Sequence, residues 1–217
     1  MPRTRKNGFT LIELLVAMAV ASILGAVIVA AYTSQVRAKN TQEALTDMNQ
    51  NARAALEIMT HEIRLAGLDP TENANARIIT ATTGELAFSM DRGNGSTHKP
   101  DGDTNDPNEN IRYALSAQGH LGRDTGGGLQ PLARNVDALN FVYLDAAGMP
   151  VAGTQAIRAI QVTIVARAGT ASGGFMYSYT NNDAYFNQQP GPPILPAQGD
   201  AFRRLRLTTT IACRNNM

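Results

Sequence analysis

The sequence of 217 residues contains one cysteine, Cys213, no tryptophan, and only 6% aromatic residues. A single cysteine excludes an intrachain disulfide and argues against a cysteine-based zinc cage. The three histidines, at positions 61, 98 and 120, form no spaced metal motif. Basic (19) and acidic (18) side chains nearly balance, so the composition does not indicate a strongly basic nucleic-acid binder. With 43% hydrophobic residues, the chain can build one globular core.

Catalytic patterns are also missing from the sequence. It has no Gly-x-Ser-x-Gly elbow, no glycine-rich phosphate loop of the right spacing and no His-Glu-x-x-His. His61 precedes Glu62 directly, and adjacent residues of a helix do not face each other, so they form no catalytic pair. The sequence therefore predicts a protein that is not an enzyme and requires no cofactor.

The N-terminus is strongly asymmetric in charge and polarity. Residues 1–8 hold three basic side chains and no acidic one, and without them the chain has 16 basic against 18 acidic side chains. Residues 9–32 are apolar except for a few positions, which are Thr10, Glu13, Ser22 and Gly25. A helix of this length crosses most of a bilayer, and the basic residues before it predict a cytoplasmic N-terminus.

Three interpretations of this segment compete: a cleavable secretory signal, a plain membrane anchor, and a specialised leader. Neither of the first two explains Glu13, because a carboxylate at membrane depth costs ~2.5–3.5 kcal/mol and normally has a partner. Glu13 is the fifth residue counted from Phe9, close to one end of the apolar run. The position of this carboxylate favours the specialised leader.

The run Lys6-Asn7-Gly8, then Phe9-Thr10-Leu11-Ile12-Glu13, then an unbroken apolar helix resembles the type IV prepilin family. The resemblance implies that a prepilin peptidase cuts between Gly8 and Phe9 and N-methylates Phe9. It also implies that Glu13 pairs with an N-terminal amine of the same or a neighbouring subunit. Residues 1–8 would be a cleaved leader, 9–32 the half of the helix in the membrane or filament core, 33–67 its upper half, and 68–217 the globular domain.

The helix itself is predicted from about Phe9 to Ala66, because no proline lies between Pro2 and Pro70. Arg64 and Gly67 give a C-terminal stop signal. In the upper half, apolar residues recur every three or four positions on one face, namely Leu45, Met48, Ala52, Leu56, Met59 and Ile63. This face is expected to cover a sheet, and it can also pack on other subunit helices.

Both ends of the globular part carry a second resemblance. The helix end Glu62-Ile63-Arg64 with Gly67, and a threonine-rich C-terminal strand followed by Arg214-Asn215, resemble PilW-type minor pilins and the related J-type pseudopilins of type II secretion. The expected fold is α+β, a type IV pilin fold with a long helix packed on a mostly antiparallel sheet. Period-two alternation and turn residues predict six strands, at 77–82, 85–90, 110–116, 138–144, 157–166 and 203–213. Cys213 is expected in the core.

Two long insertions interrupt the strands. In residues 91–110, oxygen-bearing side chains cluster within nine positions, among them Asp101, Asp103, Asn105 and Glu109. Alternating oxygen ligands are typical of calcium loops, although the glycine and final glutamate of the EF-hand pattern are missing. A solvated acidic loop is the alternative.

The second insertion, 169–200, holds five of the 12 aromatic residues: Phe175, Tyr177, Tyr179, Tyr185 and Phe186. They either pack on their own domain or contact another pilin or a tip adhesin.

The sequence thus predicts a minor pilin that primes assembly or sits at the tip of a type IV pilus. A minor pseudopilin of type II secretion is the alternative, and a pilus-linked subunit that binds DNA or an adhesin is the minority hypothesis. The expected partners are the prepilin peptidase, other minor and major pilins, inner-membrane lipid and a tip adhesin, with nucleic acid disfavoured. The expected location is the inner membrane, with the globular domain periplasmic, and then a pilus or pseudopilus.

Overall fold

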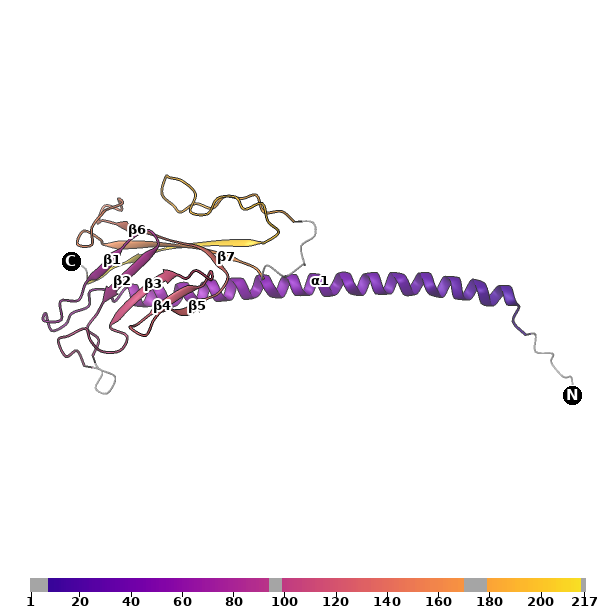
Figure 1. The fold of residues 1–217 in the computed structure, drawn as a ribbon, viewed down its shortest axis with the longest axis horizontal. Helices are drawn as coiled ribbons and strands as arrows, with labels where there is room; N and C mark the ends of the chain where they lie inside the picture. Colours follow the sequence, from indigo (N-terminus) through magenta and orange to yellow (C-terminus); the bar gives the residue numbers. More distant parts are fainter. Residues whose placement is uncertain (1–7, 94–98, 170–178, 216–217) are drawn as a thin grey trace. The chain divides into compact units, whose positions relative to one another are not determined.

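A computed structural model describes residues 8–93, 99–169 and 179–215. The chain divides into two compact units, Met1–Glu43 and Ala44–Met217. One helix, α1 (Leu11–Ile63), supplies the first unit and the start of the second. Within these described ranges the chain forms eight strands, and all of them belong to the second unit (Figure 1).

The helix α1 is a little shorter at both ends than the sequence predicts. It begins at Leu11, directly after Thr10. After Ile63 the chain tightens into i→i+3 turns, in which Leu65 N donates to Glu62 O at 2.9 Å. Gly67 then adopts a φ of 76°, and its N–H donates to Ser89 O. The left-handed conformation explains why a glycine ends the helix here.

The strands form two antiparallel sheets in place of the single sheet that we expected. The five-stranded sheet has the order β1-β2-β3-β4-β5, and the three-stranded sheet has the order β6-β7-β8. Their bounds are β1 Ile78–Ala81, β2 Glu85–Ser89, β3 Asn110–Leu115, β4 Leu121–Asp124, β5 Gln130–Ala133, β6 Val136–Leu144, β7 Ala159–Arg167 and β8 Arg204–Ala212. The sheets adjoin where Phe141 N donates to Thr83 O at 2.8 Å.

The six predicted strands are present, with ends within two residues of the prediction. The sequence did not indicate β4 or β5. Both have only four residues, β4 contains Gly122 and β5 contains Pro131, and these residue types are depleted in strands. Tertiary pairing with β3 holds β4 in place, and β5 follows as the edge of the five-stranded sheet.

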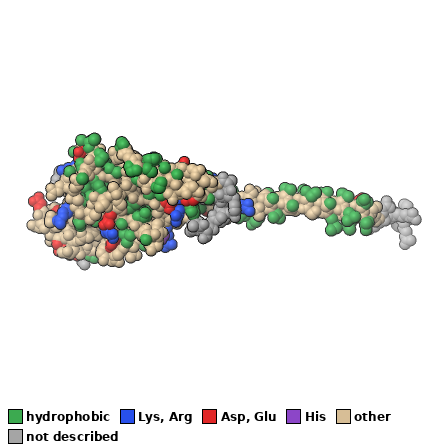
Figure 2. Space-filling view, turned by 45° about the horizontal axis from the view of Figure 1, so that its top comes forward, with side chains coloured by type: hydrophobic (Ala, Val, Ile, Leu, Met, Phe, Trp, Pro, Cys, Tyr) green, Lys and Arg blue, Asp and Glu red, His purple; other side chains and the backbone are tan. Residues whose placement is uncertain are grey.

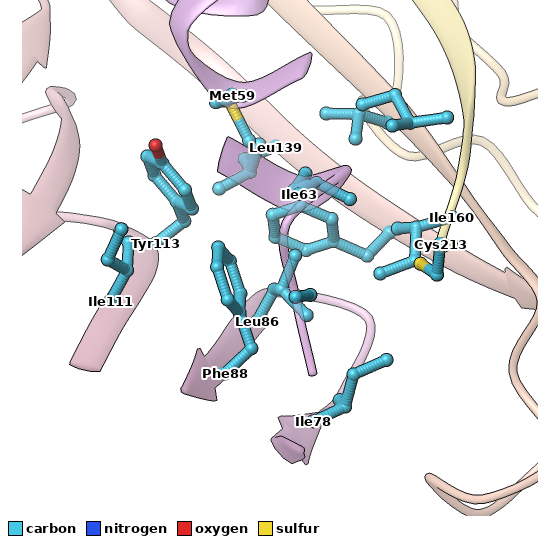
Figure 3. Close-up of a cluster of buried hydrophobic side chains, with 14 of the residues drawn as sticks. Met59, Ile63, Ile78, Leu86, Phe88, Ile111, Tyr113, Leu139, Ile160 and Cys213 are labelled. Atoms are coloured by element: carbon cyan, nitrogen blue, oxygen red, sulfur yellow. The ribbon is translucent and has the colours of Figure 1, made fainter. Parts of the chain in front are cut away.

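The core lies between the C-terminal part of α1 and both sheets. Met59 and Ile63 are fully buried in one cluster with Phe88 and Tyr113 of the five-stranded sheet and with Ile160 of β7 (Figure 3). A smaller cluster joins Met48 and Ala52 of α1 to the three-stranded sheet. The predicted apolar face of the helix and the predicted α+β architecture are therefore confirmed. Cys213 lies in the core as predicted, and its burial raises the pKa of its thiol to about 11.

Candidate assembly site on the N-terminal helix

The N-terminal part of α1 is an exposed apolar surface. It is the one helix, among the residues that the structure describes, that is long and apolar enough to cross a membrane, and none of its apolar window is buried. Figure 2 shows the hydrophobic side chains along this stretch. A bare apolar surface of this size requires lipid or other apolar helices to cover it.

The only carboxylate of the apolar run is bonded within its own chain. Glu13 Oε2 accepts hydrogen bonds from Thr10 N (3.1 Å) and from Thr10 Oγ1 (3.2 Å). In return, Glu13 N donates a hydrogen bond to Thr10 Oγ1 at 3.3 Å. This is a capping box, in which the N-cap residue and the third helical residue satisfy each other's backbone N–H. The reciprocal bonds lower the cost of bringing Glu13 into an apolar medium.

Sequence reasoning assigned no role to Thr10, although the spacing Thr-x-x-Glu before an apolar run is a known signature of this motif. Both Thr10 and Glu13 remain exposed, so the carboxylate is accessible to a second partner.

The predicted cleavage site lies just before this box. Gly8 has open space where a side chain would begin, and Phe9 is 89% exposed. Residues 1–7 of the predicted leader lie outside the described residues. Cleavage after Gly8 and methylation of Phe9 stay predictions.

Residues 3–29 match the family model described as the prokaryotic N-terminal methylation motif. The N-terminus is a type IV prepilin signal. This signal runs into the long apolar helix α1, and the antiparallel sheets follow it in the chain.

A type IV-like pilin from Thermus thermophilus is among similar solved structures, with 14% identity, a TM-score of 0.49, and coverage of 77% of this chain and 96% of that chain. Among curated proteins, none matches the sequence.

A largely buried ion pair joins the end of α1 to the five-stranded sheet. Arg123 Nη2 donates to Glu62 Oε1 at 2.8 Å and Arg123 Nε donates to Glu62 Oε2 at 3.0 Å. The Tyr113 hydroxyl, itself fully buried, also donates to Glu62 Oε2. Burial, and then the Glu62 carboxylate, raise the pKa of Tyr113 well above its usual range. Glu62 is therefore a structural anchor that faces the sheet.

The two segments that carry the PilW-type resemblance meet in space. Asn215 Nδ2 donates to Arg64 O at 3.4 Å, just past the end of α1. The last carbonyls of a helix lack partners within the helix, so the side chain of Asn215 satisfies one of the carbonyls at this end. The segment that ends α1 and the segment that follows β8 are thus joined by a hydrogen bond.

In the acidic loop, two of the predicted calcium ligands accept hydrogen bonds from backbone N–H groups of the loop itself. Glu109 is buried, and Glu109 Oε1 accepts hydrogen bonds from Arg92 N and Gly93 N, both at 3.0 Å. Asp103 Oδ1 accepts from Asn105 N, while Asp101 and Asn105 are exposed. Within the described residues, no group of three histidine, cysteine or carboxylate side chains is arranged to hold a metal. The calcium site stays a prediction.

One further carboxylate of the loop, Asp106, lies close to other negatively charged side chains. Partial loss of solvent, and then the charges of Asp101, Glu109 and Asp103, raise the pKa of Asp106. Asp106 Oδ2 is shielded from solvent and has no hydrogen-bond partner among the described residues.

The described part of the aromatic insertion lies over the three-stranded sheet. Gln188 and Asn187 bond to Gln161 of β7 and Asn140 of β6. The Tyr179 ring lies under the Arg203 guanidinium at 4.6 Å, and the Tyr185 hydroxyl accepts a hydrogen bond from Asn181.

Phe186 is 42% exposed, and it is the only predicted contact residue among the described ones that is a large exposed hydrophobic. Phe175 and Tyr177 lie outside the described residues. The interface role of these aromatics stays a prediction.

The cluster of basic residues that a DNA-binding role would use lies near the C-terminus, at positions 203, 204, 206 and 214. The Arg204 side chain is 3% exposed and bonds to Asp137 and Asp200 at 2.6 Å each. Arg203 stacks on Tyr179, and Arg206 donates to Phe186 O. Because these cations are engaged within the domain, they weaken the DNA-binding hypothesis, which needs clustered cations.

Proposed function

We propose that this chain is a minor pilin of a type IV pilus, which primes assembly or occupies the tip. The observation that carries the proposal is a prepilin signal followed by an exposed apolar helix whose only acidic residue before Glu43 is Glu13. The proposed role is structural, because a separate peptidase carries out the covalent chemistry that the chain needs, which is cleavage of the leader.

The mechanism rests on the exchange of partners at Glu13. In the membrane, the Thr10 hydroxyl and amide hold the carboxylate. Hydrolysis of the Gly8–Phe9 peptide bond creates a cationic α-amine at Phe9. In the filament, Glu13 pairs with the Phe9-type amine of a neighbouring subunit, because an amine and a carboxylate in an apolar core are stable only together. The apolar helix moves from lipid into a core of like helices.

Two features support a minor rather than a major subunit. The helix α1 runs as one element with no proline, whereas many major pilins have a proline in the apolar half. The bonded pair of Arg64 and Asn215 lies in the two segments that resemble PilW-type pilins. J-type pseudopilins of type II secretion share those segments, so a minor pseudopilin is the second candidate.

The proposal is tested by Glu13→Gln in the full chain, with Glu43→Gln as the matched control on the exposed surface of the same helix. We expect Glu13→Gln to be inserted and cleaved but to give few filaments, and Glu43→Gln to give normal numbers. Normal piliation in Glu13→Gln would remove the pairing role.

A further inference from the structure

Strand β8 forms one edge of the three-stranded sheet, and every second residue directs its backbone groups outward. Cys213 N donates to Arg158 O, and Ala168 N donates to Arg203 O, so the odd-numbered residues of this strand form the hydrogen-bonded pairs with β7. The even-numbered residues from 204 to 212 therefore point their N–H and C=O away from β7. In the part of the chain that the structure describes, no backbone group pairs with this outer edge.

The β8 edge carries Arg204 and Arg206, but it lacks three other features that normally block strand addition, which are proline, a bulge and a short length. It has nine residues, no proline, and no register shift against β7. By contrast, β6 donates Phe141 N to Thr83 O, β1 has a register shift, and β5 contains Pro131. A long, regular and unpaired edge is the geometry that accepts another strand.

The apolar side of β8 is only partly covered. Leu205 and Leu207 pack against the cluster around Met48 but remain half-buried, as does Thr209. The neighbouring strand β7 is buried along almost its whole length. A strand added beside β8 would cover the side chains that are now half-exposed.

We propose that the outer edge of β8 accepts an extended strand of a second, different pilin-type subunit by strand addition. This inference rests on the proposed function, because it takes the partner from the same assembly. Main-chain hydrogen bonds from the even-numbered residues would provide the affinity. Arg206 is exposed, and its bond to Phe186 O leaves its charge without an acidic partner within the described residues, so it favours a partner strand with an acidic side chain at the facing position.

A different subunit fits better than a second copy. Leu205 and Leu207 pack near Met48 of α1, whereas Ile211 and Cys213 share a cluster with Met59 and Ile63, so β8 runs in the same direction as the C-terminal part of α1. Antiparallel pairing of two β8 edges would point the C-terminal parts of the two α1 helices in opposite directions, which does not suit subunits that assemble side by side in one filament. Parallel self-pairing is less stable per residue.

The test is photocrosslinking of the full chain in cells that assemble it. A photoreactive benzoylphenylalanine replaces exposed Thr210 on β8 or, as a position control, exposed Ala147 in the β6–β7 turn. We expect position 210, and not 147, to yield a product with a protein identified by mass spectrometry as carrying its own processed, methylated N-terminus.

The decisive variant is Thr208→Pro, compared with Thr208→Val. Both lose the hydroxyl contact to Thr163, but only proline removes the outward N–H. We expect loss of the crosslink with proline and retention with valine, at equal melting temperatures. If Thr208→Pro melts earlier than Thr208→Val, the comparison is repeated with Ala212→Pro and Ala212→Val, whose N–H also points outward.

A crosslink that survives both prolines, that joins only a second copy, or that stays within this chain would overturn the inference. The absence of any product from position 210, in a chain whose N-terminus is Phe9, would also overturn it and would leave the proposed function intact. A chain that is never processed would instead refute the proposed function.

Discussion

Thr10 and Glu13 are bonded to each other at the start of α1, with the hydroxyl oxygen 3.2 Å from the carboxylate oxygen. The carboxylate therefore has a partner before any neighbouring subunit arrives. This arrangement explains how a single acidic residue is tolerated in an apolar helix and remains exposed for exchange.

Thr10→Val tests this relationship. Valine keeps the shape of threonine but removes the hydroxyl that bonds Glu13, so we expect the helix start to lose about 1 kcal/mol. Less of the chain should accumulate in the membrane, and filaments should be fewer. Thr10→Ser restores the hydroxyl and should restore both. Immunoblots of membrane and sheared fractions measure the effect, and equal amounts in Thr10→Val and wild type would contradict it.

Glu62→Ala tests the anchor between α1 and the five-stranded sheet. The change leaves the Arg123 guanidinium and the Tyr113 hydroxyl without their acceptor, and breaking a buried pair in this way costs about 3 kcal/mol. Glu57→Ala on the exposed side of the helix is the control and should change little. Urea unfolding of the detergent-solubilised chain gives both values. Equal midpoints for the two variants would show that the pair contributes nothing.

Alkaline pH is expected to destabilise the domain through its buried tyrosines. Burial raises the pKa of both Tyr113 and Tyr143 above the ordinary value. In the unfolded chain a tyrosine ionises near pH 10. The folded state keeps the proton longer, so this stabilisation is complete below about pH 10 and is lost as the pH rises further.

Tyr113→Phe removes one of these groups and should make the loss of stability between pH 9 and about 11 less steep than in the wild type. Tyr185→Phe in the surface segment is the control. Melting temperatures across this range measure the slopes, and identical slopes in all three proteins would exclude the contribution of Tyr113.

Asp106→Asn should raise the melting temperature at neutral pH. The pKa of Asp106 is raised, so the folded state binds its proton more tightly, and ionisation at higher pH destabilises the fold. Asparagine removes the charge that Asp101, Glu109 and Asp103 repel. The gain should shrink at acid pH, where Asp106 is protonated. Exposed Asp183→Asn serves as the control, and a melting temperature at or below the wild-type value would contradict the expectation.

Calcium offers an independent test of the same loop. If the loop binds the ion, millimolar calcium raises the melting temperature of the wild type, and Asp103→Ala abolishes the rise. No shift in the wild type would remove the calcium hypothesis and leave a solvated acidic loop.

The long helix and six of the strands could be predicted because their periodicity is long and regular. The division into two sheets could not, since it lies between β5 and β6, which follow each other in the chain but belong to different sheets. The strands β4 and β5 are too short to show a clear alternation in the sequence, and each contains a residue type that is rare in strands, Gly122 in β4 and Pro131 in β5. The Thr10–Glu13 box could have been read from its spacing. The burial of Arg204 could not, because its partner Asp137 is 67 residues away.

The most direct test of the account is mass spectrometry of the N-terminal peptide, from both the membrane fraction and sheared surface filaments. We predict a peptide that begins at an N-methylated Phe9 in both fractions. The same start in membranes alone would favour the pseudopilin. An intact Met1, or a cut beyond Tyr32, would contradict the assignment of a processed pilin subunit.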